Sequence, residues 1–397
     1  MSGYVFITNS NKPNFKEFNS RSEIRITSVS NPYLKKAINM GYNVFLGVNR
    51  AKPEELKCEL PVGLYDSHTY RSIFAIKDNY IAFKNLANLV KKNEIEVIHC
   101  NTPVGGLIGR IVGRLYNIKK VIYTAHGFHF FKGAPFLYNT VIKLAERIMA
   151  RWTDAIITMN EEDYKAAQKF KLKNNGKVFK IHGVGIDLSL YKKLFDRKKI
   201  REILKIKDDE IAIISVGDIN LNKNNIAVIE ALNKLKNNKI HYFICGEGNQ
   251  KNNLYNKTKD FKLEKQIHFL GYRNDIKDLL YASDIFINSS KREGLPRSVM
   301  EAMAVGLPCV VSNIRGNIDL IDNKKGGFLC DVNDSQSFAN AINKLSINPQ
   351  LRFDMGNYNK EHIKEFDISV VEKEIENIYQ VILDNTNKYK KYNCYAK

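Results

Sequence analysis

Short runs of apolar residues alternate with helical patterns along most of the chain, a rhythm typical of parallel α/β sheets. The runs are continuously apolar, as expected for strands that have helices on both faces. In the first half they lie at 5–8, 43–49, 97–101, 121–127 and 155–160. In the second half they lie at 211–217, 241–248, 267–272, 285–290 and 308–313. The pattern predicts two doubly wound parallel sheets in tandem.

Helical periodicity fills the intervals between these runs. In the segment 80–93, Phe83, Leu86 and Val90 recur at the spacing of one helical stripe, which predicts an amphipathic helix packed on the first sheet.

A last helix is predicted near the C-terminus. Ser369 and Glu372 have the spacing of a capping box, in which the serine opens the helix. The apolar residues that follow share one helical face: Val371, Ile375, Ile378 and Ile382.

The segment 183–200 leads from the first set of strands into a basic, polar connection and predicts a domain boundary. We expect a Rossmann-like domain over 1–187, a second over 188–368, and over 369–397 a helix that packs back toward the N-terminal domain, followed by a basic tail. Ligands of open α/β sheets bind beyond the carboxyl ends of the strands. The expected site is therefore a cleft between the two domains.

The composition fits an ordinary globular protein of 397 residues, 44% of them hydrophobic. The sequence has no run of 18 apolar residues, so no membrane-spanning helix is predicted. Residues 1–18 lack the basic and apolar regions of a secretory signal. The six cysteines form no CxxC pair and the histidines do not cluster. This usage predicts free thiols in a reducing cytoplasm and neither a disulfide framework nor a metal site.

The positive charge is uneven. The net charge is +20 overall, with +13 in residues 1–190, and within 101–150 seven basic residues accompany a single acidic one, Glu146. Such an excess indicates phosphates, either of a nucleic acid or of an anionic membrane surface. No RNP, KH, zinc-finger or helix-turn-helix signature accompanies the charge, which disfavours nucleic acid.

No GxGxxG motif follows the first predicted strand, so a nicotinamide or flavin cofactor is not predicted. The shorter Gly246-x-Gly248, after another strand, is too weak a signal to count, and a simple turn explains it better.

The stretch EGLPRSVMEAM at 293–303 holds the strongest candidate chemistry. Pro296 suits the start of a helix and Gly306 its end. A helix over roughly 296–305 leaves its first amides unpaired at the positive end of the helix dipole, which suits a diphosphate. At about 1.5 Å per residue, Glu301 lies ~7–8 Å along the axis from Pro296. Glu293 and Glu301 could then accept hydrogen bonds from sugar hydroxyls on either side of the diphosphate.

Two other interpretations of these carboxylates stand beside this one. Either glutamate could lie on a solvated surface. The pair could also be the acid and nucleophile of a glycosidase, which needs carboxyl groups about 5–9.5 Å apart. That second interpretation gives the diphosphate-ready helix end no role.

Glu293 and Glu301 are followed directly by AMAVGLPCVVSNIRGN. Together these residues resemble the donor motif of glycosyltransferase family 4, retaining enzymes of the GT-B fold. Other matching motifs occur in the family's order: VIHCNTPVGGLIGR, VIYTAHGFHFFKGAP, ITMNEEDY, GVGID, ICGEG and FLGYRNDI. The resemblance covers nearly the whole chain and is greatest to bacterial members that extend lipid-linked sugars during capsule or exopolysaccharide assembly.

The resemblance implies a function. A hexosyl or N-acetylhexosaminyl group would pass, with retained configuration, from a nucleotide sugar such as a UDP-sugar to a hydroxyl of a polyprenyl-diphosphate-linked saccharide. Neither a metal nor another cofactor is implied. The protein would work in the cytoplasm as a peripheral protein on the inner face of the plasma membrane.

The resemblance also implies roles for single residues. Glu293 would bind a donor-sugar hydroxyl, Glu301 the ribose, Lys223 the phosphates, and His126 would face the sugar from the first domain. The remaining donor-binding positions that it implies are Gly246, Tyr272, Arg273, Gly294, Leu295, Pro296, Arg297 and Arg315. Tyr272 and Arg273 fall where the base is held, and Arg297 or Arg315 would supply a second phosphate contact.

The chain departs from the family in two places. Asp218 stands where many relatives carry an arginine that contacts the phosphates, which leaves more of that charge to Lys223. The segment 8–31 is longer than the usual glycine-containing first loop, and we expect it to recognise the acceptor.

Other acceptor-side candidates follow the third and fourth strand runs of the first half. Gly105 and Gly106 could allow a ligand to approach closely or could pack in a turn. His129 and Lys132 could line the acceptor site, although an interfacial packing role suits His129 equally well.

The segment 128–153 mixes aromatic residues with Lys132, Lys143, Arg147 and Arg151. It predicts either contact with an anionic membrane or a core helix with a solvated basic face.

Two further functions were weighed. A nucleotide-sugar epimerase of the same fold would need acid and base carboxylates beside the sugar in the first domain, and none is identified. An inactive nucleotide-sugar-binding partner protein is disfavoured by the intact set of Glu293, Glu301, Lys223 and His126.

Overall fold

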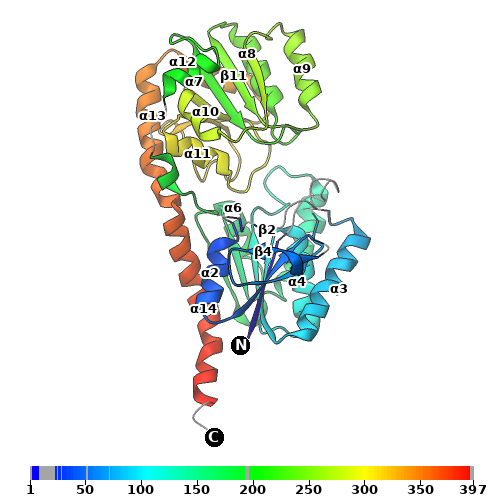
Figure 1. Cartoon of the computed structure of the whole chain (residues 1–397). Helices are drawn as coiled ribbons and strands as arrows, with labels where there is room; N and C mark the ends of the chain where they lie inside the picture. The colour runs from blue at the N-terminus through cyan, green and yellow to red at the C-terminus, as the bar shows by residue number, and fades with distance from the viewer. Residues whose placement is uncertain are drawn as a thin grey trace. The chain divides into compact units, whose positions relative to one another are not determined.

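The chain folds into two compact units, one comprising Met1–Val184 and Val371–Lys397 and the other Gly185–Val370 (Figure 1). The expected boundaries, after residues 187 and 368, fall a few residues from these divisions. The computed structural model describes residues 2–8, 23–24, 26–27, 29–50, 52–70, 72–192 and 196–393.

A parallel sheet forms the centre of the first unit. Its described strands number seven and lie in the order β5-β3-β1-β6-β7-β8-β9. They are β1 Gly3–Ile7, β3 Asn43–Val48, β5 Gly63–Asp66, β6 Ile95–Asn101, β7 Lys120–Ala125, β8 Ala155–Thr158 and β9 Lys177–Lys180. A separate pair consists of β2 Glu23–Ile24 and β4 Lys57–Cys58. The five strands predicted for this half are confirmed, and the edge strands β5 and β9 are additional.

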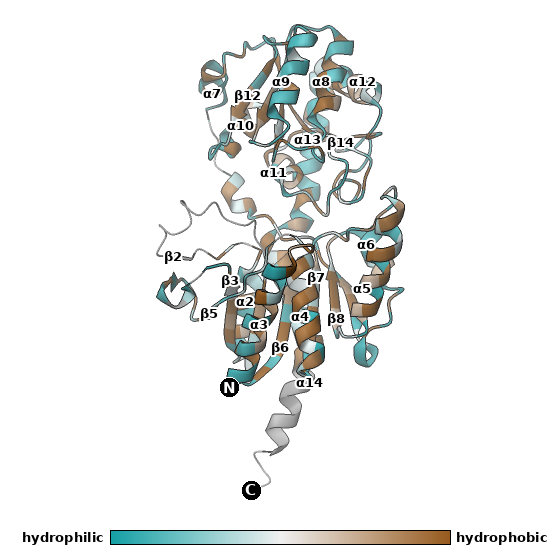
Figure 2. Ribbon diagram, turned by 90° about the vertical axis from the view of Figure 1, so that its right-hand side faces the viewer, coloured by the Kyte–Doolittle hydropathy of each residue, from teal (hydrophilic) through white to brown (hydrophobic). Residues whose placement is uncertain are grey.

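Helices cover both faces of this sheet. They are α2 Asn31–Asn39, α3 Ile76–Lys92, α4 Pro103–Leu115, a π-helical turn η2 Tyr138–Ile142, α5 Lys143–Ala150, α6 Glu161–Ala167 and α14 Ile368–Asn393, with 3₁₀ turns η1 Pro53–Glu55 and η3 Lys173–Asn175. Side chains of β1 alternate between the faces, as the pleat requires. Val5 and Ile7 share a core with α3, α4 and α5, which lie in front of the sheet in Figure 2. Phe6 stacks on Tyr33 of α2 on the opposite face.

The C-terminal helix α14 is anchored to the first sheet by a buried polar cluster. His99 of β6 lies 2.8 Å from the Tyr379 hydroxyl through Nδ1 and 2.7 Å from the Thr124 hydroxyl through Nε2. Tyr4 of β1 joins the same cluster, 3.0 Å from His99. The apolar face predicted for this helix is confirmed, because its four residues are all buried. A helix far along the sequence thereby completes the first unit.

The start of α14 differs from the predicted capping box. The Asp367 carboxylate accepts a 2.9 Å hydrogen bond from the Ser369 amide and a 2.6 Å bond from its hydroxyl. The helix therefore begins at Ile368, and Asp367 supplies the cap that we had assigned to Ser369.

The glycines of α4 serve packing. A side chain on Gly106 would place its Cβ 2.5 Å from a ring carbon of Tyr123, and one on Gly105 would meet Ile7 at 3.3 Å. The missing side chains let α4 lie close against the sheet. This corrects the suggestion that these two glycines open space for a ligand.

The second unit has a parallel sheet of six described strands in the order β12-β11-β10-β13-β14-β15. They are β10 Ile211–Val216, β11 Ile240–Cys245, β12 Ile267–Gly271, β13 Ile285–Asn288, β14 Cys309–Ser312 and β15 Gly327–Cys330. All five strands predicted for this half are confirmed, and β15 is additional. The two sheets together confirm the expected α/β class with two Rossmann-like units.

Seven described helices surround the second sheet. They are α7 Arg197–Ile203, α8 Asn225–Leu235, α9 Lys251–Asp260, α10 Ile276–Ala282, α11 Arg297–Val305, α12 Ser335–Ser346 and α13 Pro349–His362, with 3₁₀ turns η4 Leu188–Tyr191 and η5 Ile363–Phe366. α7, α10 and α11 pack on one face, and α8, α9 and α12 pack on the other.

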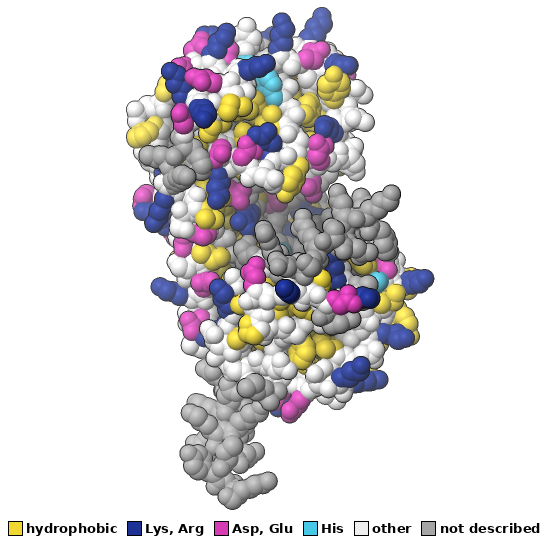
Figure 3. All heavy atoms as spheres, in the orientation of Figure 1, with side chains coloured by type: hydrophobic (Ala, Val, Ile, Leu, Met, Phe, Trp, Pro, Cys, Tyr) yellow, Lys and Arg dark blue, Asp and Glu magenta, His cyan; other side chains and the backbone are white. Residues whose placement is uncertain are grey.

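Four cysteines of the two sheets, Cys100, Cys245, Cys309 and Cys330, are buried free thiols. No helix in the described part of the chain is both long and apolar enough to span a bilayer. The basic residues are scattered among acidic and apolar side chains on the face shown in Figure 3 and form no continuous stripe there.

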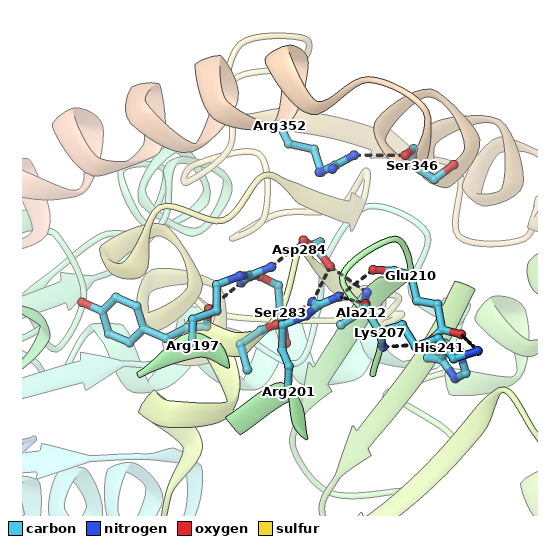
Figure 4. A network of polar contacts seen from close by, with 12 residues as sticks. Arg197, Arg201, Lys207, Glu210, Ala212, His241, Ser283, Asp284, Ser346 and Arg352 are labelled. Carbon is cyan, nitrogen blue, oxygen red and sulfur yellow. Dashed lines mark hydrogen bonds and ion pairs between the residues drawn. The ribbon is translucent and has the colours of Figure 1, made fainter. Parts of the chain in front are cut away.

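An ion-pair network fastens α7 to the amino end of β13 (Figure 4). The Asp284 carboxylate lies 2.7 Å from Arg197 and 3.0 Å from Arg201, and it accepts a 2.8 Å hydrogen bond from the Ala212 amide. Arg201 also donates to the Lys207 and Glu210 carbonyls, both at 2.7 Å. The side chains of Asp284 and Arg201 are 12% and 5% exposed, whereas Arg197 is 43% exposed. Losing Asp284 would therefore leave the buried charge of Arg201 without a counter-ion.

We expect Asp284→Ala to lower the free energy of unfolding by about 3 kcal/mol, because it leaves the buried Arg201 without its counter-ion and the Ala212 amide without its acceptor. Chemical denaturation followed by circular dichroism measures the loss. Asp209→Ala is the matched control, since it removes an exposed pair with Lys239 and surface pairs contribute little. Equal stability of the two variants would contradict the assignment.

Candidate functional site

The helix predicted at 296–305 is confirmed as α11, which spans Arg297–Val305. Pro296 occupies the N-cap position with φ −76° and ψ 114°, one residue before the helix, and the helix ends at Gly306 with φ 82°. The inward face of α11 is buried against the sheet. The packing fixes its N-terminus at the carboxyl end of β13.

The first turn of α11 has unpaired amides. The Val299 and Met300 amides both donate to the Pro296 carbonyl, at 3.1 and 3.4 Å. Across the described parts of the chain, no acceptor is paired with the amide of Leu295 or Ser298. Two N–H donors at the positive end of a helix dipole form an environment that favours an anion.

A second loop braces the turn before α11. Arg315, whose exposed fraction is only 4%, donates from Nε to the Glu293 carbonyl at 3.1 Å. Gly316 has φ +79°, and a side chain there would collide with the Gly294 carbonyl. Arg315 therefore supports the backbone of this turn, and its expected contact with a phosphate stays a prediction.

Lys223 and Glu293 form one charged pair. Their Nζ and Oε1 atoms are 2.7 Å apart, with side-chain exposed fractions of 24% and 14%. Asn222 ties the two loops together, because its side chain donates to the Arg292 carbonyl at 3.0 Å and its carbonyl accepts from the Lys291 amide at 2.7 Å. The resemblance implies that Lys223 binds the phosphates and Glu293 a sugar hydroxyl. In the structure the two side chains form an ion pair with each other.

A small pocket beside this pair lies at the carboxyl ends of β10 and β13. Its lining consists of Ser215, Val216, Gly217, Lys223, Asn225, Ile287, Asn288, Ser289 and Ser290. The Ser290 hydroxyl is buried and has no hydrogen-bond partner among the described residues. No sequence signal distinguishes Ser290, because a serine at the end of a strand is an ordinary turn residue.

Glu301 is held by neighbours on its own side of α11. Its Oε1 lies 3.1 Å from the Arg297 Nε, and its charge acts on the nearby Tyr191 hydroxyl. Burial and the Glu301 charge raise the pKa of Tyr191. Arg297, the first residue of α11, thus already has one acidic partner on the helix, and its expected contact with a phosphate stays a prediction.

The other donor-binding candidates have different surroundings. Tyr272 is 80% exposed beyond β12, and Arg273 is paired with Asp275 at 2.8 Å. The Gly246 amide donates to the Gly271 carbonyl at 2.8 Å, and a side chain on Gly246 would collide with the Gly217 carbonyl. Gly246 thus packs closely against the protein, and its expected contact with the donor stays a prediction.

His126 lies in the first unit, directly after β7. Its Nε2 is buried without a partner in the described parts of the chain. Burial lowers the pKa of His126 to about 4, and burial together with the charge of His126 lowers the pKa of His99 to about 3. Both imidazoles are therefore neutral at pH 7.

A larger pocket of about 340 Å³ lies in the same unit and includes Lys132 in its lining. His129, in the same loop, is half-buried and has an interaction partner of its own. The segment 8–31, expected to recognise the acceptor, lies mostly outside the described residues. No cluster of three metal-ligating side chains occurs in the described part of the chain.

Comparison with known proteins identifies the family. The family described as "Glycosyl transferases group 1" matches residues 196–362, and "Glycosyl transferase 4-like" matches 27–160. The putative glycosyltransferase EpsD of Bacillus subtilis (strain 168) is 30% identical over 368 residues, which cover 90% of this chain and 94% of EpsD. The chain therefore belongs to the group 1 glycosyltransferases with a GT4-like first domain, as its sequence motifs predicted.

Two other proteins extend this comparison. The Escherichia coli UDP-Gal:alpha-D-GlcNAc-diphosphoundecaprenol alpha-1,3-galactosyltransferase is 33% identical over 315 residues, 78% of this chain and 81% of that protein. The crystal structure of Anabaena Alr3699/HepE in complex with UDP and glucose has a TM-score of 0.74 at 18% identity and covers 96% of this chain and 100% of that one. The similarity to the HepE structure confirms the GT-B fold.

We expect the nuclear magnetic resonance signals of His99 and His126 to remain those of neutral imidazole from pH 7 down to pH 5. In the unfolded chain, histidine takes up its proton near pH 6.5, whereas in the folded protein these two do so at about 3 and about 4. Between these values the unfolded state binds more protons, so the free energy of unfolding falls as the pH is lowered from about 6.5. A histidine spectrum in which either residue titrates between pH 6 and 7 would contradict the burial described above.

Proposed function

We propose that this glycosyltransferase moves a sugar from a UDP-sugar to a hydroxyl of a polyprenyl-diphosphate-linked saccharide, with retained anomeric configuration. The observation that carries the proposal is the braced tip of α11, with unpaired amides at Leu295 and Ser298 beside the Lys223–Glu293 pair. The role in capsule or exopolysaccharide assembly and the place at the inner face of the plasma membrane belong to the same proposal.

The donor half of the proposal follows from charge. A diphosphate needs several N–H donors and a cation, and the amides and Lys223 supply both. An ammonium group has three donors, so Lys223 can keep its contact with Glu293 while it binds a phosphate oxygen. HepE, which shares the fold, was crystallised with UDP and glucose.

The carboxylates receive the sugar hydroxyls in this arrangement. Glu293 accepts from the transferred sugar and Glu301 from the ribose. Arg297 holds the Glu301 carboxylate in place before the ligand arrives, which reduces the entropy lost on binding. Tyr272 and Arg273 keep their proposed place at the base, and His126 its proposed place at the sugar.

The acceptor half rests on the named relative. The Escherichia coli enzyme, by its name, acts on GlcNAc-diphosphoundecaprenol. Transfer of this kind forms a bond from the acceptor oxygen to the anomeric carbon as the bond from that carbon to the phosphate oxygen breaks. The departing diphosphate takes the acceptor proton on the same face, and the α11 amides and Lys223 stabilise its growing charge.

We expect Lys223→Ala to lower kcat about 10²-fold, because it removes a charge that stabilises the leaving diphosphate. Glu301→Ala should instead raise KM for the nucleotide sugar about ten-fold through the loss of hydrogen bonds to a charged group. Lys234→Ala, on the exposed side of α8 in the same unit, is the matched control and should leave both constants unchanged. Normal kinetics in the first two variants, purified and folded, would remove the proposed donor site.

We also expect the reaction to proceed without a bound metal, because protein groups supply the positive charge that the diphosphate needs. Initial rates after dialysis against EDTA should equal those before it, with or without added Mg²⁺. A rate that collapses in EDTA and returns with Mg²⁺ or Mn²⁺ would contradict this expectation.

A further inference from the structure

We propose that the larger pocket of the first unit binds the diphosphate of the lipid-linked acceptor, while apolar side chains next to it enter the membrane surface. We name it the basic pocket. It is lined by Phe130, Phe131, Lys132, Asn139, Lys143, Arg147, Glu162, Asp163, Lys165, Ala166 and Lys169. This inference rests on the proposed function and adds to it a specific site for the carrier lipid.

Three separate elements build the basic pocket. The loop after β7 contributes Phe130 and Lys132, α5 contributes Lys143 and Arg147, and α6 with the residues after it contributes Lys165. Phe130 forms part of an aromatic stack, with its ring centroid 4.7 Å from that of Phe128. The wall is thus firmly packed on the core side, and the pocket of about 340 Å³ is large enough for a diphosphate.

The acidic side chains of the basic pocket already accept hydrogen bonds from other protein groups. Glu162 accepts a 2.7 Å hydrogen bond from the Lys132 amide. Asp163 is buried and accepts bonds from the Phe128 amide at 3.1 Å and the Asn160 side chain at 2.8 Å. These carboxylates stabilise the loop, and the lining still has five cationic side chains against these two acidic ones.

Most of the positive charge remains uncompensated. Lys165 has an ion pair with Glu161 at 3.3 Å. Within the described ranges, no carboxylate lies at ion-pair distance from Lys143, Arg147 or Lys169. A cluster of such cations in a concave site matches a multiply charged diphosphate, which can accept several charge-assisted hydrogen bonds at once.

An apolar stripe runs beside the basic pocket on the same helical segment. Leu137, Val141, Leu144 and Ile148 recur every three or four residues and are 44% to 61% exposed. Glu146 lies on the inward side and pairs with the buried Arg110 at 2.7 Å. In Figure 2, α5 and the turns before it show these hydrophobic segments in brown.

The segment 137–148 therefore presents cations toward the basic pocket and apolar groups toward solvent. A lipid diphosphate satisfies both at once, because its phosphates meet the cations and its chain and neighbouring lipids cover the stripe. The charge complementarity favours this ligand over a second protein.

The location also suits an acceptor. His126 begins the loop that reaches Phe130 four residues later, so their Cα atoms are at most about 14 Å apart. A saccharide attached to a diphosphate in the basic pocket would extend along this loop toward His126.

Photoaffinity labelling of the full chain tests the inference. The probe is a benzophenone-bearing farnesyl diphosphate, and mass spectrometry locates the labelled peptides. The test variant combines Lys143→Gln and Arg147→Gln. Its control combines Lys91→Gln and Lys92→Gln, two exposed cations at the end of α3, and makes the same change in net charge.

We expect labelling within 130–169 and a half-saturating probe concentration about ten-fold higher in the test variant than in the wild type. The control should match the wild type, and farnesyl diphosphate should compete far better than inorganic diphosphate or farnesol. Equal labelling of both variants, or labels outside 130–169, would overturn the site. Equal competition by inorganic diphosphate would overturn the lipid assignment, and equal competition by farnesol the diphosphate assignment.

The thermal shift that UDP causes reports on the donor site of the second unit. If that shift is normal while the labelling fails, only the acceptor site is wrong. If the shift is absent in the wild type, the proposed donor function fails as well.

Discussion

The structure of the donor site depends on a backbone turn that is held open at the start of α11. Turns that precede a helix usually satisfy their amides through a capping side chain, but Pro296 at the N-cap has none to offer. Arg315 and Gly316 brace the turn from behind, while α11 is fixed by the burial of its inner face. Two amide donors near the start of the helix therefore remain without an acceptor among the described residues. Donors fixed in advance need little reorganisation when charge develops, which is what stabilisation of a leaving diphosphate requires.

The charged groups around this turn balance one another in the free protein. Lys223 forms an ion pair with Glu293, and Arg297 forms one with Glu301. Each carboxylate keeps a cation close to the turn, and in the proposed function each also accepts hydrogen bonds from sugar hydroxyl groups. The proposed acceptor site in the first unit contrasts with this arrangement, because its cations outnumber the carboxylates and those carboxylates serve the loop. Its uncompensated charge is consistent with a ligand that brings its own negative charge to a membrane surface.

Much of the fold could be predicted from the sequence, because continuously apolar strands and an amphipathic terminal helix follow directly from burial. The strands β5 and β9 were missed since they lie at sheet edges and carry polar residues, which weakens the apolar signal. The cap of α14 was misplaced by two residues because Ser369 and Asp367 are both good capping residues, and only the hydrogen bonds distinguish them.

The candidate site was predictable in part for a related reason. The position of α11 follows from local signals, a proline before it and a glycine after it. The pairing of Lys223 with Glu293 joins residues 70 positions apart, and no sequence pattern encodes that distance. Glycines were equally ambiguous, since Gly106 and Gly246 lie in close contact with other protein atoms, and a sequence shows only that a side chain is missing.

The most direct test of the central claim is a crystal structure of this protein with UDP. The account predicts diphosphate oxygens about 3 Å from the amide nitrogens of Leu295 and Ser298 and from Lys223 Nζ. A diphosphate bound elsewhere, with those two amides still unoccupied, would contradict it.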